Sequence, residues 1–250
     1  MSDAETPVDR PIAMSVREAR MYVGRILLTC GLPSGSVIAV TECILTSQSA
    51  GYGGFASLLR THGDLRMDGF ARVRVTDVEP CTLDVDGGEV HAWILAPTLL
   101  DLAVDVARRQ GTAILRVRDV RAPGELRILS DLARRHGALA DVAFEEATIT
   151  ATFTNGSPPR QASRWDPLLL RALQHGYPVK ESLWRDLHAL SNGALARDSV
   201  LSRRHAGPVI LLDDGTVVGR QPSDDDYDPD MLKSVASSAA PVPLTPVRPR

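Results

Sequence analysis

The hydrophobic and polar positions of residues 83–119 change from strand spacing to helix spacing and back, and the rest of the chain is arranged around this stretch. Leu83–Val85 and Glu89–Leu95 flank Asp86-Gly87-Gly88, which predicts a hairpin, because Asp-Gly pairs accept the positive φ angles of a tight turn. Pro97 then opens a helix that ends at Gly111, and strand-like alternation follows. The residues predicted to share its core are Leu99, Leu102, Val106, Leu115 and Val117.

Two helices are predicted before this unit. Ser15 and Glu18 form a capping box, in which Ser15 accepts from the backbone of Glu18 and the Glu18 side chain reaches back. Gly31 ends this helix, and Pro33 and Ser34 begin a second one, so we expect an antiparallel pair. The apolar face of the first helix consists of Ala19, Tyr22, Val23, Ile26, Leu27 and Cys30.

The remaining pattern alternates strands and helices. Phe70–Val78 is predicted as a half-exposed strand. Beyond the central unit, the predicted elements are a helix over Glu125–His136, strands over Ala138–Phe144 and Ala147–Phe153, helices over Trp165–Gln174 and Glu181–Leu190, and a hairpin of Val209–Leu212 with Thr216–Gly219. This order predicts the α+β class: a mixed sheet core with an N-terminal helix pair and a helical C-terminal segment.

The same pattern divides the chain into four parts. We expect a disordered arm over residues 1–13 and an α/β core with its helix pair over 14–156. A helical segment with the small hairpin follows over 163–222. Residues 223–250 are an acidic run and then a Pro/Ala/Ser-rich tail, a composition that cannot bury enough apolar surface to become ordered.

Composition excludes several classes of function. With a net charge of −3, the chain lacks the excess of positive charge that binding to nucleic acid or to an anionic membrane requires. No apolar run is long enough to span a bilayer. The acidic N-terminus is unlike a secretory signal. Three widely spaced cysteines and six histidines form no metal-ligand pattern, so we predict a cytoplasmic protein without a metal.

Three stretches resemble the type 2 malate/L-lactate dehydrogenase family, which includes sulfolactate, ureidoglycolate and piperideine-2-carboxylate enzymes. They are SVREARMYVGRILLTCGLPSGSVIAVTECILTSQSAG, AWILAPTLLDLAVDVARRQGTAILRVRD and ARRHGALADVAF, and together they cover a little over half of the chain. The resemblance implies a non-Rossmann NAD(P)-binding fold, a homodimer and a small carboxylate as substrate. Trp184–Gly207 also resembles a bacterial family without an assigned function, in SLWRDL and SRRHAG.

The positions that carry the family's chemistry differ here. The family's R-G-x-D-S-H-G aligns with residues 50–56, so its His falls on Phe55 and its Asp on Gly53. Its V-R-N-S-x-H-x-G aligns with residues 117–124, where Asp119 replaces the Asn, Ala122 replaces the His and Gly124 remains. The resemblance therefore implies a chain shorter than its relatives that lacks the family's acid–base groups.

Other residues stay candidates for chemistry. The candidate residues for binding a carboxylate are three arginines, whose guanidinium groups suit it, and one tyrosine of the glycine-rich turn: Arg60, Arg118, Arg121 and Tyr52. His62 and His91 are candidate proton carriers, since Asp86 and Glu89 beside His91 would raise its pKa. A surface strand histidine and solvated surface arginines are the competing interpretations. Asp119 and Gly124 are the candidate cofactor contacts, by resemblance.

Two functions from different classes fit these observations. One is a protein that acts on or binds a small carboxylate, such as a 2-oxo acid, an imino acid or an amino-acid derivative, without NAD-dependent hydride transfer. The other is a non-catalytic homodimeric partner of another enzyme. An active NAD(P)H-dependent reductase also remains open.

Overall fold

The computed structural model describes residues 9–156, 166–195, 210–211 and 217–218. The chain divides into two compact units, Met1–Leu195 and Ala196–Arg250. In the second unit the structure describes β8 (Ile210–Leu211) and β9 (Val217–Val218), which pair antiparallel as the predicted hairpin requires. The predicted tail over 223–250 lies outside the described residues. No described helix combines the length and the apolar character needed to cross a membrane.

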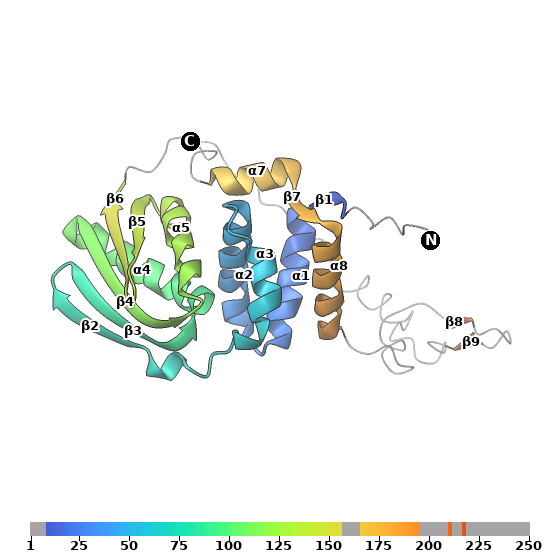
Figure 1. Cartoon of the computed structure of the whole chain (residues 1–250), viewed down its shortest axis with the longest axis horizontal. Helices are drawn as coiled ribbons and strands as arrows, with labels where there is room; N and C mark the ends of the chain where they lie inside the picture. Colours follow the sequence, from blue (N-terminus) through green and yellow to red (C-terminus); the bar gives the residue numbers. More distant parts are fainter. Residues whose placement is uncertain (1–8, 157–165, 196–209, 212–216, 219–250) are drawn as a thin grey trace, which may run out of the picture. The chain divides into compact units, whose positions relative to one another are not determined.

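A helical layer forms one side of the first unit (Figure 1). Its elements are α1 (Val16–Thr29), α2 (Ser34–Ser49), α3 (Gly54–Thr61), α7 (Pro167–His175) and α8 (Glu181–Ser191). The predicted helix pair is confirmed, and the Ser15 hydroxyl accepts from the Glu18 N–H at 3.1 Å. The Glu18 carboxylate does not reach back, because it accepts from Trp184 Nε1 on α8 at 2.8 Å instead.

A five-stranded mixed sheet forms the opposite side. Its strands are β2 (Arg74–Glu79), β3 (Thr82–His91), β4 (Thr112–Arg121), β5 (Ala138–Phe144) and β6 (Ile149–Asn155), in the order β2-β3-β4-β6-β5. Only β3 and β4 run parallel; the other neighbours are antiparallel. Residues 70–72, predicted as strand, form the 3₁₀ turn η2 (Phe70–Arg72), and β2 is exposed along its whole length.

The predicted hairpin at Asp86-Gly87-Gly88 is wrong. β3 continues through it as one strand, and its register with β4 shifts between Asp86 and Val90. This is a bulge, in which extra residues leave the ladder and Gly88 takes a φ of +55°. A side chain at Gly87 would collide with Val120 and with the Asp119 carbonyl of β4, so the glycine permits the close approach of the two strands.

Two helices lie between the sheet and the helical layer (Figure 1). α4 (Ala92–Gln110) begins five residues before Pro97, which lies inside it, and the 3₁₀ turn η3 (Pro123–Ile128) leads into the short α5 (Leu129–Arg135). Most of the predicted core is confirmed, since Leu99, Val106, Leu115 and Val117 are buried. Leu102 is the exception, because it lies at the margin of the helix stripe and is only half-buried.

Residues 11–13, predicted as part of a disordered arm, belong to a strand. β1 (Pro11–Met14) pairs antiparallel with β7 (Tyr177–Lys180), which joins α7 to α8. The helices α7 and α8 contact α1, α2 and α3. The helices of the predicted segment over 163–222 belong to the helical layer, and the chain divides after Leu195.

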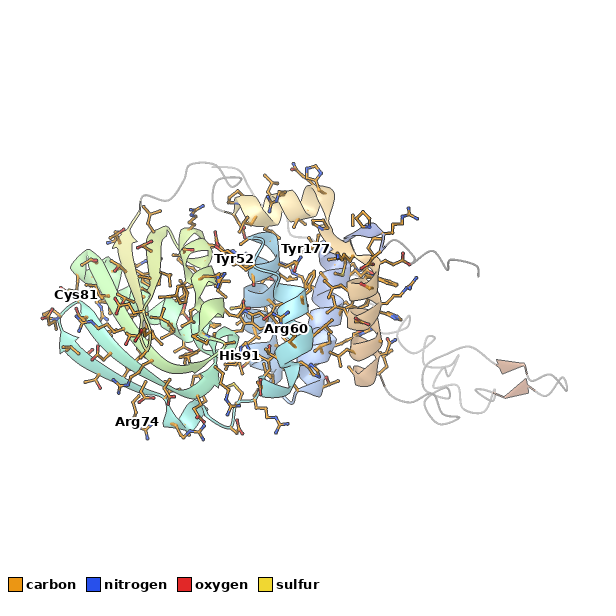
Figure 2. All side chains as sticks on the ribbon, in the orientation of Figure 1. Tyr52, Arg60, Arg74, Cys81, His91 and Tyr177 are labelled. Carbon is orange, nitrogen blue, oxygen red and sulfur yellow. The ribbon has the colours of Figure 1, made fainter. Side chains whose placement is uncertain are left out.

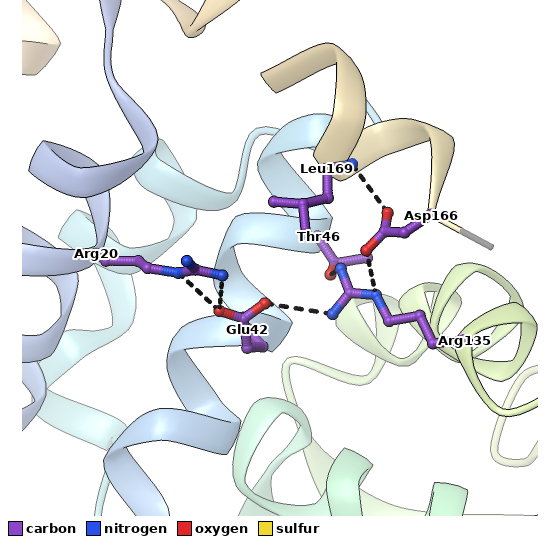
Figure 3. Close-up of polar contacts among 6 residues, drawn as sticks. All are labelled: Arg20, Glu42, Thr46, Arg135, Asp166 and Leu169. Carbon is purple, nitrogen blue, oxygen red and sulfur yellow. Dashed lines mark hydrogen bonds and ion pairs between the residues drawn. The ribbon is translucent and has the colours of Figure 1, made fainter. Parts of the chain in front are cut away.

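Arg135 on α5 joins the sheet side to the helical layer (Figure 3). Its guanidinium contacts Glu42 at 3.3 Å, the Thr46 hydroxyl at 3.0 Å and the Asp166 carboxylate at 2.7 Å. Asp166 also caps α7 by accepting from the Leu169 N–H at 2.8 Å. One side chain thus fixes three elements, α2, α5 and α7.

Candidate functional site

The carboxyl ends of the parallel strands β3 and β4 bring two of the predicted residues together. His91 and Arg121 are register partners at the last position of each strand. His91 is fully buried, and its Nδ1 accepts from the Trp93 backbone N–H at 3.2 Å, which caps the N-terminus of α4. Figure 2 shows His91 where the sheet meets the helices. Sheet ends of this kind are common ligand sites in α/β proteins.

The protonation of His91 differs from the sequence prediction. Burial lowers its pKa to about 4, and this outweighs Asp64, whose charge acts in the opposite direction. The predicted rise in pKa is wrong, because the side chain is buried and desolvation disfavours its charged form more than nearby carboxylates favour it. The ring is neutral at pH 7, and since Nδ1 accepts, the proton is on Nε2. His91 can therefore donate a hydrogen bond but has no readily ionised proton to transfer.

Two buried N–H groups at this position have no partner among the described residues. They are Nε2 of His91 and Nε1 of Trp93. Both side chains are fully buried, and their ring centroids are 5.0 Å apart at an interplanar angle of 45°. A buried donor without an acceptor costs about 1–3 kcal/mol, so two neighbouring ones are a feature that needs an explanation.

A charged rim accompanies these donors. The Arg121 guanidinium lies 3.8 Å from the Asp64 carboxylate and 3.6 Å from that of Glu89, and Glu89 also lies 3.8 Å from Arg72. The Arg121, Asp64 and Glu89 side chains are each about half exposed, so these ion pairs are weak and easily exchanged for other partners.

Backbone strain is concentrated at the same strand ends. Among the described residues, three that are not glycine have positive φ: Glu89 at 59°, Asp119 at 56° and Ala122 at 50°. Each conformation of this kind costs of order 1 kcal/mol for a residue with a side chain. Such strain is typical of ligand sites, so it supports the assignment of function to this region.

The remaining predicted residues lie elsewhere. Tyr52 is in the turn after α2, where Arg127 covers its ring at 5.1 Å and Asp131 faces its hydroxyl at 3.5 Å. Burial, and then Asp131, raises the pKa of Tyr52. Gly124 lies nearby in η3, and its carbonyl accepts from Arg127 Nε at 2.6 Å. These contacts join the turn after α2 to η3 and α5.

The contacts of two further predicted arginines and one predicted histidine do not include His91. Arg118 on β4 is paired with Asp86 at 3.3 Å. Arg60 is exposed in the last turn of α3, and no ion pair to it is found in the described part of the chain. His62 follows that turn, with Nδ1 3.0 Å from the Leu59 carbonyl oxygen.

Sequence reasoning missed several polar contacts. The Glu125 carboxylate accepts from the Ser47 hydroxyl at 2.9 Å and the Ser57 hydroxyl at 2.7 Å, which joins η3 to α2 and α3. Trp93 was missed because its position in an apolar helix stripe resembles that of any core residue. Its indole N–H becomes notable only when its neighbours are known.

Phe55 is a core residue, with its side chain packed among other buried groups. Phe55 is fully buried in α3, and its ring meets Tyr177 edge-on with the centroids 5.4 Å apart. Its backbone N–H donates to the Gln48 side-chain oxygen at 3.1 Å. Gly53, just before α3, has a φ of +75°, which a residue with a side chain adopts only with strain.

Comparisons with known proteins show which solved structures share this fold. No family model matches the sequence. No curated protein matches it either. A dehydrogenase from Sinorhizobium meliloti matches 73% of this chain and 100% of its own, with 12% identity and a TM-score of 0.55. A protein from E. coli, provisionally assigned as a malate/lactate dehydrogenase, matches 76% of this chain and 98% of its own, with 9% identity and a TM-score of 0.55. The chain therefore has the α+β fold of malate/lactate dehydrogenase-like proteins.

Proposed function

We propose that this protein binds a small carboxylate at the carboxyl ends of β3 and β4, without NAD-dependent hydride transfer. The observation that carries the proposal is the pair of buried, unpartnered donors, His91 Nε2–H and Trp93 Nε1–H, beside the Arg121 guanidinium. The ligand class is that of 2-oxo acids, imino acids and amino-acid derivatives, which share a carboxylate on a small body.

The chemistry of the unpaired atoms favours a carboxylate over a water molecule. Both unpaired groups at this position are donors, and a carboxylate oxygen only accepts. A bridging water would bring two O–H groups that need acceptors of their own. The third buried atom without a hydrogen bond among the described residues, Asp84 Oδ1, lies seven positions earlier on β3 and is 3.9 Å from the Arg116 guanidinium. Arg121 supplies the positive charge that offsets the cost of desolvating an anion.

The proposed absence of hydride transfer rests on two positions that lack a histidine, 55 and 122. Reduction of a 2-oxo acid places negative charge on the carbonyl oxygen, and a positioned acid contributes about 10²–10⁴-fold by protonating it. Phe55 stands where the resembling family has its histidine, and Ala122 where it has a second one. His91 is no substitute, because its low pKa keeps the ring neutral.

The indole N–H of Trp93 allows a direct test by NMR. The ¹H–¹⁵N spectrum contains three indole signals, one for each tryptophan, and Trp93→Phe identifies that of Trp93. We expect pyruvate to shift this signal downfield and to saturate, and pyruvamide, which has no charge, to shift it much less. The Trp184 signal is the internal control, because its N–H already donates to Glu18.

Matched variants separate the site from its surroundings. Arg121→Met should abolish the pyruvate-dependent shift, whereas Arg118→Met, which removes a neighbouring guanidinium of the same strand, should leave it intact. His91→Asn should weaken binding, since asparagine still caps α4 but lacks the Nε2 donor. If none of the acids tested changes the chemical shift of the Trp93 indole N–H in the folded protein, the proposed site is wrong.

Absorbance at the NADH band tests the absence of hydride transfer. We expect no turnover of pyruvate with NADH or NADPH, and no oxidation of malate, lactate or sulfolactate with NAD or NADP. Steady turnover that is lost on heating would show that the protein is an active dehydrogenase. It would contradict this half of the proposal even if the carboxylate site were confirmed.

A further inference from the structure

A cavity opens between α2, α7 and β7. Its volume is about 540 Å³, which is within the usual range of roughly 300–1,000 Å³ for small-molecule sites. Its lining includes the polar residues Gln48, Arg171, His175 and Tyr177 and the apolar residues Leu168 and Pro178. The cavity shares no residue with the β3–β4 site. Figure 2 shows Tyr177 among the helices and His91 lower in the view, where the sheet meets them.

A positive charge lines this cavity. It is the Arg171 guanidinium, and no aspartate or glutamate is among the described residues that line the cavity. Arg171 is held in place because its Nη2 donates to the Ser49 carbonyl at the C-terminus of α2. The planar guanidinium has five N–H donors, and this one bond leaves others for a ligand.

The polar groups around Arg171 are fixed by packing. Tyr177 is buried, and burial raises the pKa of its hydroxyl, so the phenol stays neutral beside the cavity. α7, which carries Arg171 and His175, is docked through Asp166 and Arg135. Arg171 is therefore carried by a helix, α7, whose N-terminus is anchored to the rest of the first unit.

We infer that this cavity is a binding site for a small organic anion with an apolar body, in which Arg171 binds the carboxylate and the Leu168–Pro178 wall contacts the body. A bare inorganic anion would leave the apolar wall unused, and a neutral apolar molecule would leave the guanidinium unpaired. The inference is independent of the proposed function, because it concerns other residues.

Phenylacetate is a suitable probe, with phenylacetamide and acetate as controls that lack the charge or the ring. The readout is the backbone amide signals of Gly51 and Gly176, which border the cavity and lie in a well-resolved region of the spectrum. We expect saturable shifts with phenylacetate and at least about tenfold weaker binding of each control, the loss expected for one charge-assisted contact.

Substitutions then test the role of Arg171. Arg171→Gln should weaken phenylacetate binding about tenfold or more, and Arg171→Lys should retain part of it. Arg185→Gln is the control, since Arg185 is an exposed arginine of α8 paired with Glu181. Because Arg171 also contacts Ser49, His175→Gln serves as a second variant that leaves this contact intact. Equal binding of the acid and its amide, or equal effects of Arg171→Gln and Arg185→Gln, would overturn the inference.

Discussion

At the scale of single residues, His91 links stability to pH. Its pKa is about 4 in the folded protein and about 6.5 in an unfolded chain, so protonation favours unfolding. The stabilising contribution is complete above pH 6.5 and is lost as the pH falls toward 4. Protonation would also turn the capping nitrogen into a donor and place a positive charge at the N-terminus of α4.

We therefore predict that the wild-type protein loses about 2–3 kcal/mol more stability between pH 7.5 and pH 4.5 than His91→Asn does. The variant retains the cap but has no group that titrates in this range. Urea unfolding at the two pH values measures the difference, and all other titrating groups cancel in the comparison. Equal pH dependence of the two proteins would contradict the buried, neutral state of His91.

A second residue-scale prediction concerns Phe55. Phe55→His alone should not produce hydride transfer, because Gly53 offers no side chain to orient the new imidazole and the second histidine position holds Ala122. The substitution also places a polar ring in a fully buried site, so we expect a loss of about 2–4 kcal/mol in urea unfolding. Turnover in the NADH assay by this variant would show that one group limits the chemistry.

At the scale of elements, α4 provides a comparison within one helix. Leu99 is buried and Leu102 is half-buried, although they are only three residues apart. Leu99→Ala should cost about 2–5 kcal/mol, the range for core truncations, and Leu102→Ala clearly less, about 1–2 kcal/mol. Urea melts of the two variants measure this, and a larger loss for Leu102→Ala would mean that the helix is rotated about its axis.

Arg135 allows a test of how the layers are held. Arg135→Met removes one of the two arginine partners of Glu42, which keeps Arg20, and removes the ion pair of Asp166; the two carboxylate side chains are about one quarter and one fifth exposed. We expect a loss of about 1–3 kcal/mol, less than for a fully buried pair because solvent screens the charges that remain. The amides of α7 should also exchange faster with solvent, since Asp166 loses the contact that fixes this cap. Unchanged exchange in α7 would show that apolar contacts alone dock it.

Elements with local signals could be predicted from the sequence. Ser15 and Gly31 mark the ends of α1, and the alternation of residues 138–144 gives β5 with its observed bounds. The bulge in β3 was missed because Asp-Gly-Gly has the same local geometry in a bulge as in a turn. Only the pairing with β4 decides between them, and that pairing is not local.

The candidate site depends even more on long-range packing. Arg121 and His91 were predicted singly, but their pairing follows from the β3–β4 register. Asp64 comes from the turn after α3, and the burial of His91 and Trp93 is a property of the folded core. Sequence neighbours such as Glu89 therefore gave the wrong direction for the pKa of His91, because desolvation is the larger effect.

At the scale of the whole molecule, the unit boundary after Leu195 gives a fifth prediction. A fragment of residues 1–195 should fold alone and melt within a few degrees of the full chain, because its core is complete. A fragment of residues 1–175 lacks β7 and α8 and should melt much lower, since Tyr177 and Leu187 are buried in that core. Thermal unfolding followed by circular dichroism measures both.

The pairing of β1 with β7 has a consequence for the order of events during folding. Pro11 is opposite Lys180, so nearly all of the first unit lies between the two strands. Closing so long a loop costs entropy that only an already formed interior can offset, which makes this two-stranded sheet a late step. On a ribosome the first strand must wait until residue 180 has emerged, and until then its N–H and C=O groups remain open to water or to chaperones.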